Sequence, residues 1–183
     1  MDILLLDGNP DPARAAWEGW LEAFTLKAEA AGAAVHLRRL REMDIRFCTG
    51  CWSCWWATPG LCVHKDDMPG LYPRMLAADL VVWASPLVMG NVSALTKKTQ
   101  DRFIPLIHPF IELAHGECHH RRRYPIDIDM GLIVEAGPGD TEEDLAIMRR
   151  QHERLALNSR GRLRLCATTE RNAEEAAHEA VGA

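Results

Sequence analysis

This 183-residue chain lacks several features that would place it in a membrane or on a nucleic acid. It has no apolar run long enough to cross a bilayer, and Asp2 places an acid where a secretion signal carries positive charge. Its formal net charge of −5 argues against general binding to nucleic acids or anionic membranes. We therefore expect a cytoplasmic protein, and the length suits a single domain over residues 1–183.

Cysteine stands out among the residue types that are present. Four of the six cysteines lie in one short segment with the spacing C-x2-C-x2-C-x7-C: Cys48, Cys51, Cys54 and Cys62. Two-residue gaps let neighbouring thiolates converge on one centre, and the run resembles the ligand run of a cubane iron–sulfur cluster. Without a secretion signal, the segment indicates metal or redox chemistry rather than disulfide bonds.

Two other interpretations of the cysteine segment stay open. The first is structural zinc, which more often uses two separated C-x2-C or C/H pairs. The second is a set of free or redox-active thiols, because a compact cysteine loop can persist after its metal is lost. In each case, the loop at about 44–66 is expected to be an insertion into the surrounding fold.

Short apolar runs that end at turn residues predict buried parallel strands, and helical spacing of apolar residues predicts helices between them. We expect strands at 3–6, 34–37, 80–84, 131–134 and 162–167, and helices at 12–31, 69–77, 93–103, 141–157 and from about 171. Asp11 is the expected cap of the first helix, Pro12 its first residue and Gly32 its end. The expected buried stripe of that helix is Trp17, Trp20, Leu21, Phe24 and Ala28.

Strands that alternate with helices predict an α/β fold, a doubly wound five-stranded parallel sheet with helices on both faces. Ligands of such a sheet bind beyond the carboxyl ends of the strands. The loops 7–12, 85–91 and 135–140 lie at that edge, and the cysteine loop follows the second strand to the same edge. A cofactor resting on these loops would lie beside the cysteines.

The segment 115–124 is unusual because Cys118, His119 and His120 precede three arginines. A solvated basic loop is the simplest interpretation. The functional alternatives are a site for cofactor phosphates, or histidines that reach the cysteine loop and complete a metal site.

Several motifs resemble the flavodoxin-like NAD(P)H-dependent FMN reductases and, among these, the iron–sulfur flavoproteins. The motifs are the cysteine run with Asp66-Asp67-Met68, then Ala78-Asp79-Leu-Val-Val, Ser85-Pro86 with Gly90-Asn91 and Ser93, and Lys97-Lys98 with Asp101-Arg102. They follow the family's order over roughly residues 1–140. Beyond that point only the strand–helix pattern matches.

The resemblance implies a flavodoxin-like fold with FMN at the carboxyl edge, NAD(P)H as electron donor and a [4Fe-4S] cluster on the four cysteines. Its candidates for the FMN phosphate are Asn9, Asp11 and Arg14. Its candidates for the flavin ring are Ser85, Pro86, Leu87, Val88, Met89, Gly90, Asn91, Glu135, Ala136 and Gly137. Backbone N–H groups in such loops can hold flavin carbonyl oxygens, and no general acid or base is required.

The phosphate loop departs from the family pattern, which offers hydroxyls and often an arginine. This chain has Gly8-Asn-Pro-Asp-Pro-Ala-Arg14, in which two prolines remove N–H donors. Asp11 places a carboxylate where the phosphate should lie, a repulsion on the order of 1–3 kcal/mol unless that carboxylate turns away. Arg14, one turn on, would offset it.

Two functions are therefore compared. The first is an FMN-dependent NAD(P)H oxidoreductase that serves a small-molecule or protein electron acceptor, with no nucleic acid or membrane as partner. The second is a flavodoxin-like module without flavin, whose cysteine loop binds a metal or acts as a thiol sensor. We expect a homodimer or a higher homo-oligomer. Under the first function, Trp52, Trp55 and Trp56 would shield a cluster or form the surface between subunits, because exposed aromatic residues are unfavourable.

Overall fold

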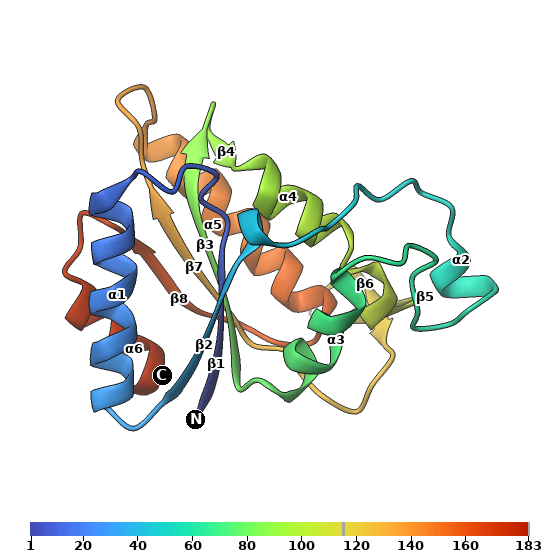
Figure 1. The fold of residues 1–183 in the computed structure, drawn as a ribbon. Coiled ribbons are helices and arrows are strands. Elements are labelled where there is room, and N and C mark those ends of the chain that lie inside the picture. The colour runs from blue at the N-terminus through green and yellow to red at the C-terminus, as the bar shows by residue number, and fades with distance from the viewer. Residues whose placement is uncertain (115, 183) are drawn as a thin grey trace.

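A parallel five-stranded sheet forms the centre of the structure, a computed structural model that describes residues 1–114 and 116–182 (Figure 1). Its strands are β1 (Asp2–Asp7), β2 (Ala34–Arg39), β3 (Leu80–Val88), β7 (Met130–Glu135) and β8 (Leu163–Thr168). Their order, β2-β1-β3-β7-β8, is that of flavodoxin-like sheets and confirms the predicted fold class. The short β4 (Asn91–Val92) turns back to pair antiparallel with the end of β3.

Helices cover both faces of the sheet (Figure 1). One face carries α1 (Ala15–Ala30) and α6 (Ala173–Gly182), and the other carries α3 (Met68–Ala77), α4 (Ala94–Asp101) and α5 (Glu142–Asn158). Alternate residues of one strand serve the two layers, since Leu4 and Leu6 contact the α3 side while Ile3 and Leu5 contact the α1 side. No helix in the described ranges has the length and apolar character to span a bilayer.

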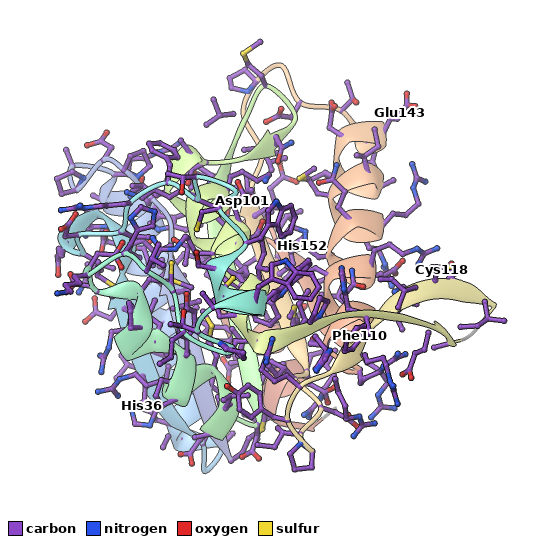
Figure 2. All side chains as sticks on the ribbon, turned by 90° about the vertical axis from the view of Figure 1, so that its right-hand side faces the viewer. His36, Asp101, Phe110, Cys118, Glu143 and His152 are labelled. Carbon is purple, nitrogen blue, oxygen red and sulfur yellow. The ribbon has the colours of Figure 1, made fainter. Side chains whose placement is uncertain are left out.

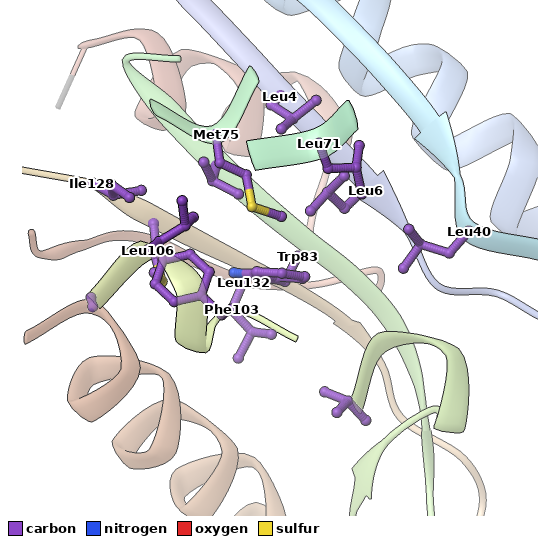
Figure 3. Packing of buried hydrophobic residues seen from close by; sticks show 14 of the residues in the cluster. Leu4, Leu6, Leu40, Leu71, Met75, Trp83, Phe103, Leu106, Ile128 and Leu132 are labelled. Atoms are coloured by element: carbon purple, nitrogen blue, oxygen red, sulfur yellow. The ribbon is translucent and has the colours of Figure 1, made fainter. Parts of the chain in front are cut away.

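Trp83 lies in the middle of the layer on the α3 side. It is fully buried, and Figure 3 shows it among Met75, Phe103 and Leu132. Because the central strands are covered on both faces, they are apolar along their whole length, which is why the sequence predicts them well.

The first helix begins three residues later than predicted, at Ala15 instead of Pro12. Asp11 does not cap it, because its side chain closes a local turn by accepting from the N–H of Ala13 at 2.9 Å. The predicted end is confirmed, since Gly32 follows with a φ of +92°. Four residues of the predicted stripe are fully buried, and Trp20 is only half-buried.

The segment after α4 is a hairpin, so the prediction of a basic loop at 115–124 is wrong for its described residues; residue 115 lies outside the described residues. After the 3-10 turn Ile104–Leu106, β5 (Ile107–Ala114) pairs antiparallel with β6 (Glu117–Arg122). The proline at position 109 is tolerated because it lies where the register shifts between Ile107 and Ile111. Leu113 pairs with Cys118 near the tip of the hairpin.

Candidate functional site

The loops after β1 and β3 are joined by close polar contacts at the carboxyl edge of the sheet. Ser93 caps α4, donates from Oγ to the carbonyl of Gly8 at 2.5 Å, and donates from its N–H to Oγ of Ser85 at 2.8 Å. A Cβ on Gly8 would lie 1.8 Å from Oγ1 of Thr96, so only glycine permits this approach of loop and helix. The loop after β1 and the end of β3 therefore both contact the N-terminal turn of α4.

The loops after β3 and β7 are joined by Asp140. Its carboxylate accepts from the N–H of Gly90 at 3.1 Å and from the N–H of Gly137 at 2.7 Å. The chain turns at Met89 and Gly90, whose φ values are 53° and 72°. The side chain of Met89 is 98% exposed.

The structure divides the predicted ring contacts into two groups. Residues 85–88 belong to β3 rather than to a loop, and the side chains of Ser85, Pro86 and Leu87 are buried. Those side chains pack inside the protein beneath the carboxyl edge of the sheet. Val88 and Met89 expose apolar side chains above it, Asn91 is exposed in β4, and residues 135–137 flank it from the end of β7. The loops that the resemblance assigns to the ring therefore do meet.

The backbone donors of the phosphate loop are engaged within the loop itself. The N–H groups of Asn9, Asp11 and Ala13 donate to side-chain oxygens of Asp7, Asn9 and Asp11, at 2.9, 3.1 and 2.9 Å respectively. The remaining N–H groups of residues 8–15 donate to backbone carbonyls, and the prolines at 10 and 12 have none. A phosphate on this loop must therefore displace an internal hydrogen bond or use a side chain.

Arg14 is the cation nearest in sequence to this loop, and it is also engaged. Its guanidinium lies 2.7 Å from the carboxylate of Glu135, so it links the loop after β1 to the end of β7. The side chain of Arg14 is 39% exposed. An exposed ion pair of this kind is weak, so a phosphate dianion can compete for the arginine.

Sequence reasoning missed two residues that hold the phosphate loop in place. Asp7 is fully buried and accepts from Nε1 of Trp17 at 2.9 Å and from Arg41 at 2.8 Å. Arg41 also pairs with Glu18 at 2.9 Å. The available signal was an acidic residue at the end of a wholly apolar strand, because such a carboxylate needs buried partners.

The four cysteines line one pocket. Cys48 and Cys51 are exposed, Cys54 and Cys62 are half-buried, and all are free thiols. Within residues 1–114 and 116–182, however, no three Cys, His, Asp or Glu side chains are arranged closely enough to hold a metal ion. The donors fit a thiophilic centre in type and share one pocket, but the distances between them do not form a ligand set.

Two of these thiols have perturbed acidity. The pKa of Cys51 is lowered by hydrogen bonds from the N–H and the hydroxyl of Ser53. The pKa of Cys54 is raised by burial and then by the charges of Cys62, Cys48 and Cys51. The second shift reflects the half-buried position of Cys54 beside the other three thiols, where a bound cation would be stabilised.

The cysteine loop is fastened at its base and along one side. At the base, Asp44 and Asp67 exchange hydrogen bonds of 2.8 and 2.9 Å. Along the side, Nε1 of Trp55 donates to the carbonyl of Ile104 at 3.1 Å, and the Trp55 ring lies 5.3 Å from the ring of His120. The loop therefore packs on the hairpin.

The cysteine pocket and the carboxyl-edge loops lie at opposite ends of α4. Ser93 begins this helix at the edge, while Asp101 and Arg102 at its end line the pocket. Eight helical residues span about 12 Å. The prediction that the cysteines lie directly beside the edge is therefore wrong, because the segment between β2 and α3 extends away from the sheet, towards the right of Figure 1.

The residues of β6 do not reach the thiols. His120 meets the cysteine loop through Trp55, while His119 contacts Asn158 at 3.2 Å and Glu117 at 3.2 Å. Figure 2 shows Cys118 out on the hairpin, well away from Asp101. This geometry does not support a ligand role for His119 or His120 at the cysteine loop.

Comparisons with known proteins agree with this architecture. The sequence model of a family described as NADPH-dependent FMN reductase matches residues 1–117. An iron–sulfur flavoprotein of Archaeoglobus fulgidus is 31% identical over 131 residues, which cover 71% of this chain and 53% of that protein. An iron–sulfur flavoprotein of Methanosarcina thermophila is 39% identical over 63 residues, 34% of this chain and 32% of that protein. The chain thus matches about half or less of the length of these curated relatives.

Solved structures share the fold at low sequence identity. The azoreductase AzrA superposes with a TM-score of 0.69 at 15% identity and covers 100% of both chains. An NAD(P)H:quinone oxidoreductase from Methanothermobacter marburgensis superposes with a TM-score of 0.65 at 19% identity, over 99% of this chain and 98% of that one. These likenesses show a common fold.

Proposed function

Because the chain belongs to the family of NADPH-dependent FMN reductases, we propose that it is an FMN-dependent oxidoreductase that takes reducing equivalents from NAD(P)H. The observation that carries the proposal is the joining of the three carboxyl-edge loops by Ser93 and Asp140. These contacts fix the backbone where a flavin ring would lie, with Val88 and Met89 as apolar cover. Arg14 would hold the phosphate once it turns from Glu135.

The cysteine pocket is the proposed second centre. Its support is that Cys48, Cys51, Cys54 and Cys62 line one pocket and that the matched relatives are named iron–sulfur flavoproteins. Bound FMN would accept a hydride and release single electrons, and a [4Fe-4S] cluster would carry those electrons towards a small-molecule or protein acceptor. The chain's own part would be to hold the two centres at opposite ends of α4.

Anaerobic purification tests both centres at once. We expect flavin absorption bands together with iron and acid-labile sulfide in equal amounts. Cys51→Ala should lose iron and sulfide but keep flavin, while the control Cys118→Ala, on the hairpin, should keep all three. Flavin without iron in the wild-type chain would reduce the proposal to a plain flavin reductase, and Cys51→Ala with full iron content would refute the ligand assignment.

A second function, a flavodoxin-like module without flavin, is favoured by one observation. Every backbone N–H of residues 8–15 already has a partner. Under this alternative the fold carries the cysteine loop as a metal site or thiol sensor, and the carboxyl edge binds no flavin.

Titration with FMN and with riboflavin, followed by flavin fluorescence, separates the two functions. Riboflavin lacks the phosphate, so it reports on the ring site alone. Asp11→Asn should tighten FMN by about tenfold, since it removes roughly 1.4 kcal/mol of repulsion, and should leave riboflavin unchanged. If neither flavin is quenched by the wild-type chain or the variant, the flavin-free function holds.

A homodimer through the cysteine loop and the hairpin is the proposed assembly. Its support is a group of exposed apolar side chains on these two adjoining elements, which water solvates poorly. The group is Phe47, Trp52, Trp56, Leu61, Val63, Phe110, Ile111 and Leu113.

A further inference from the structure

One donor of a buried arginine at the cysteine pocket has no partner among the described residues. The side chain of Arg102 is 1% exposed. Its Nη1 donates to Asp66 at 2.7 Å and to the carbonyl of Arg46 at 2.8 Å, and its Nη2 donates to Asp66 at 3.0 Å. The Nε–H, on the other edge of the guanidinium, is buried and makes no hydrogen bond to any residue that the structure describes.

The position of Arg102 is fixed, so Nε cannot turn out to water. Its carbonyl accepts from the hydroxyl of Tyr72 at 3.0 Å, and Asp66 is itself held by the N–H groups of Arg46 and Met68 at 3.0 and 3.2 Å. A buried N–H without an acceptor is unfavourable, and native proteins keep few of them. The pocket next to Arg102 therefore should contain its acceptor.

The pocket offers the sulfurs of the four cysteines as acceptors, beside polar atoms of Thr49, His64 and Asp101 that also line it. Arg102 lines the same pocket as the four cysteines. Burial acts to lower the pKa of Arg102, but the hydrogen bond to Asp66 outweighs it and raises the pKa, so the guanidinium keeps its charge. A guanidinium N–H beside a thiolate forms a charge-assisted hydrogen bond.

We propose that Nε–H of Arg102 donates to a sulfur of the cysteine site and that the fixed charge of Arg102 stabilises the centre bound there. The inference rests on the proposed function, which places that centre on the four cysteines. Arg102 is a positioning residue, because it acts through the sulfurs and coordinates nothing itself. Hydrogen bonds and positive charge at thiolate sulfurs favour the more negative, reduced state, so Arg102 raises the reduction potential of a cluster.

Three variants separate this role from a structural one. Arg102→Lys keeps the positive charge and a partner for Asp66 but lacks the Nε–H. Arg102→Gln also removes the charge. Asp66→Asn keeps Arg102 and weakens only the clamp that holds it. Two measurements apply to each variant: the Zn²⁺ affinity of the reduced, iron-free chain by chelator competition, and the midpoint potential of the reconstituted cluster followed by electron paramagnetic resonance.

We expect Arg102→Lys to lose about tenfold in Zn²⁺ affinity and to lower the midpoint potential, with larger effects in Arg102→Gln. Asp66→Asn should not lower the potential, because it removes a negative charge near the site. The inference is overturned if Asp66→Asn lowers the midpoint potential as much as Arg102→Lys does. It is also overturned if Arg102→Lys changes neither the midpoint potential nor the Zn²⁺ affinity. If the wild-type chain binds no iron or sulfide, the proposed cluster is refuted, and the Zn²⁺ affinities of the variants still decide the role of Arg102. A wild-type chain that binds neither iron nor Zn²⁺ overturns both the proposed cluster and the role of Arg102.

Discussion

Gly8 is the tightest point between the loops of the carboxyl edge and α4. The residue has no side chain, and the space that a methyl group needs is filled by Oγ1 of Thr96 at 1.8 Å and Cβ of Thr96 at 3.1 Å. Gly8→Ala should therefore destabilise the fold by about 1–3 kcal/mol, as overpacking does, which a lower urea midpoint would report. Thr96→Ala in the same chain should recover part of the loss.

Gly19 provides the matched control for that substitution. It lies inside α1, and a Cβ there meets nothing within 4 Å. Gly19→Ala should raise the stability by roughly 0.5–1 kcal/mol, because alanine loses less entropy in a helix. Equal midpoints for the two variants would contradict the account of Gly8.

The lowered pKa of Asp66 makes the stability of the fold around the cysteine loop depend on pH. Burial acts to raise the pKa of Asp66, but hydrogen bonds from Arg102 and from the N–H groups of Arg46 and Met68 outweigh it and lower the pKa from 3.8 to about 2. A carboxyl with a lowered pKa stabilises the fold above its unfolded pKa and loses that effect as the pH falls through the folded value. The contribution at neutral pH is on the order of 2 kcal/mol.

The urea midpoints of wild type and Asp66→Asn should therefore differ at pH 7 and converge between about pH 4 and pH 2. Asp101→Asn is the control, since Asp101 forms an exposed pair with Lys97 and should change little at any pH. A difference that stays constant down to pH 3 would show that the charge of Asp66 is not what stabilises the loop.

Among the elements, Trp55 joins the cysteine loop to the hairpin and to the 3-10 turn that precedes it. Trp55 donates to the carbonyl of Ile104 and lies against His120, whereas Trp56 in the same turn is 66% exposed. Trp55→Ala should raise hydrogen exchange in residues 48–62 by about tenfold with the sheet unchanged, while Trp56→Ala should have little effect. Equal exchange in the two variants would argue against this attachment.

The elements also show how far the sequence predicts this fold. The central strands and α5 are predicted because burial on both faces and regular amphipathic spacing leave one consistent assignment. The hairpin formed by β5 and β6 is not predicted, because its strands carry charged residues and a proline. These strands also depend on contacts with distant elements such as α5. The third strand extends four residues beyond its predicted end at Ala84, so residues 85–88 of the expected loop lie at the end of β3.

The candidate site shows the same limit. The grouping of the four cysteines follows from their spacing, which a local loop suffices to satisfy. The internal bonding of the phosphate loop and the clamp between Arg102 and Asp66 join residues far apart in sequence, so no local pattern predicts them. The position of the cysteines at the far end of α4 likewise depends on how the loop packs on the hairpin.

The whole molecule is asymmetric in its exposed apolar surface. The cysteine loop and the hairpin adjoin each other on the right of Figure 1 and carry eight of the large exposed apolar side chains, including Trp56 and Leu113, which are 66% and 76% exposed. On the opposite face of the sheet, α1 exposes Leu26. A second copy of the chain is the occupant that the proposed homodimer assigns to this surface.

Sedimentation velocity at several concentrations tests that assembly. The wild-type chain should sediment as a dimer, and Trp56→Ser with Leu113→Ser should weaken dimerisation by about a hundredfold or more, because each substitution acts twice in a two-fold interface. Leu26→Ser, at 58% exposure on α1, removes a comparable side chain outside the interface and should leave the dimer intact. A wild-type chain that stays monomeric at every concentration, or a dimer that Leu26→Ser disrupts equally, would show that the loop and hairpin do not join two copies.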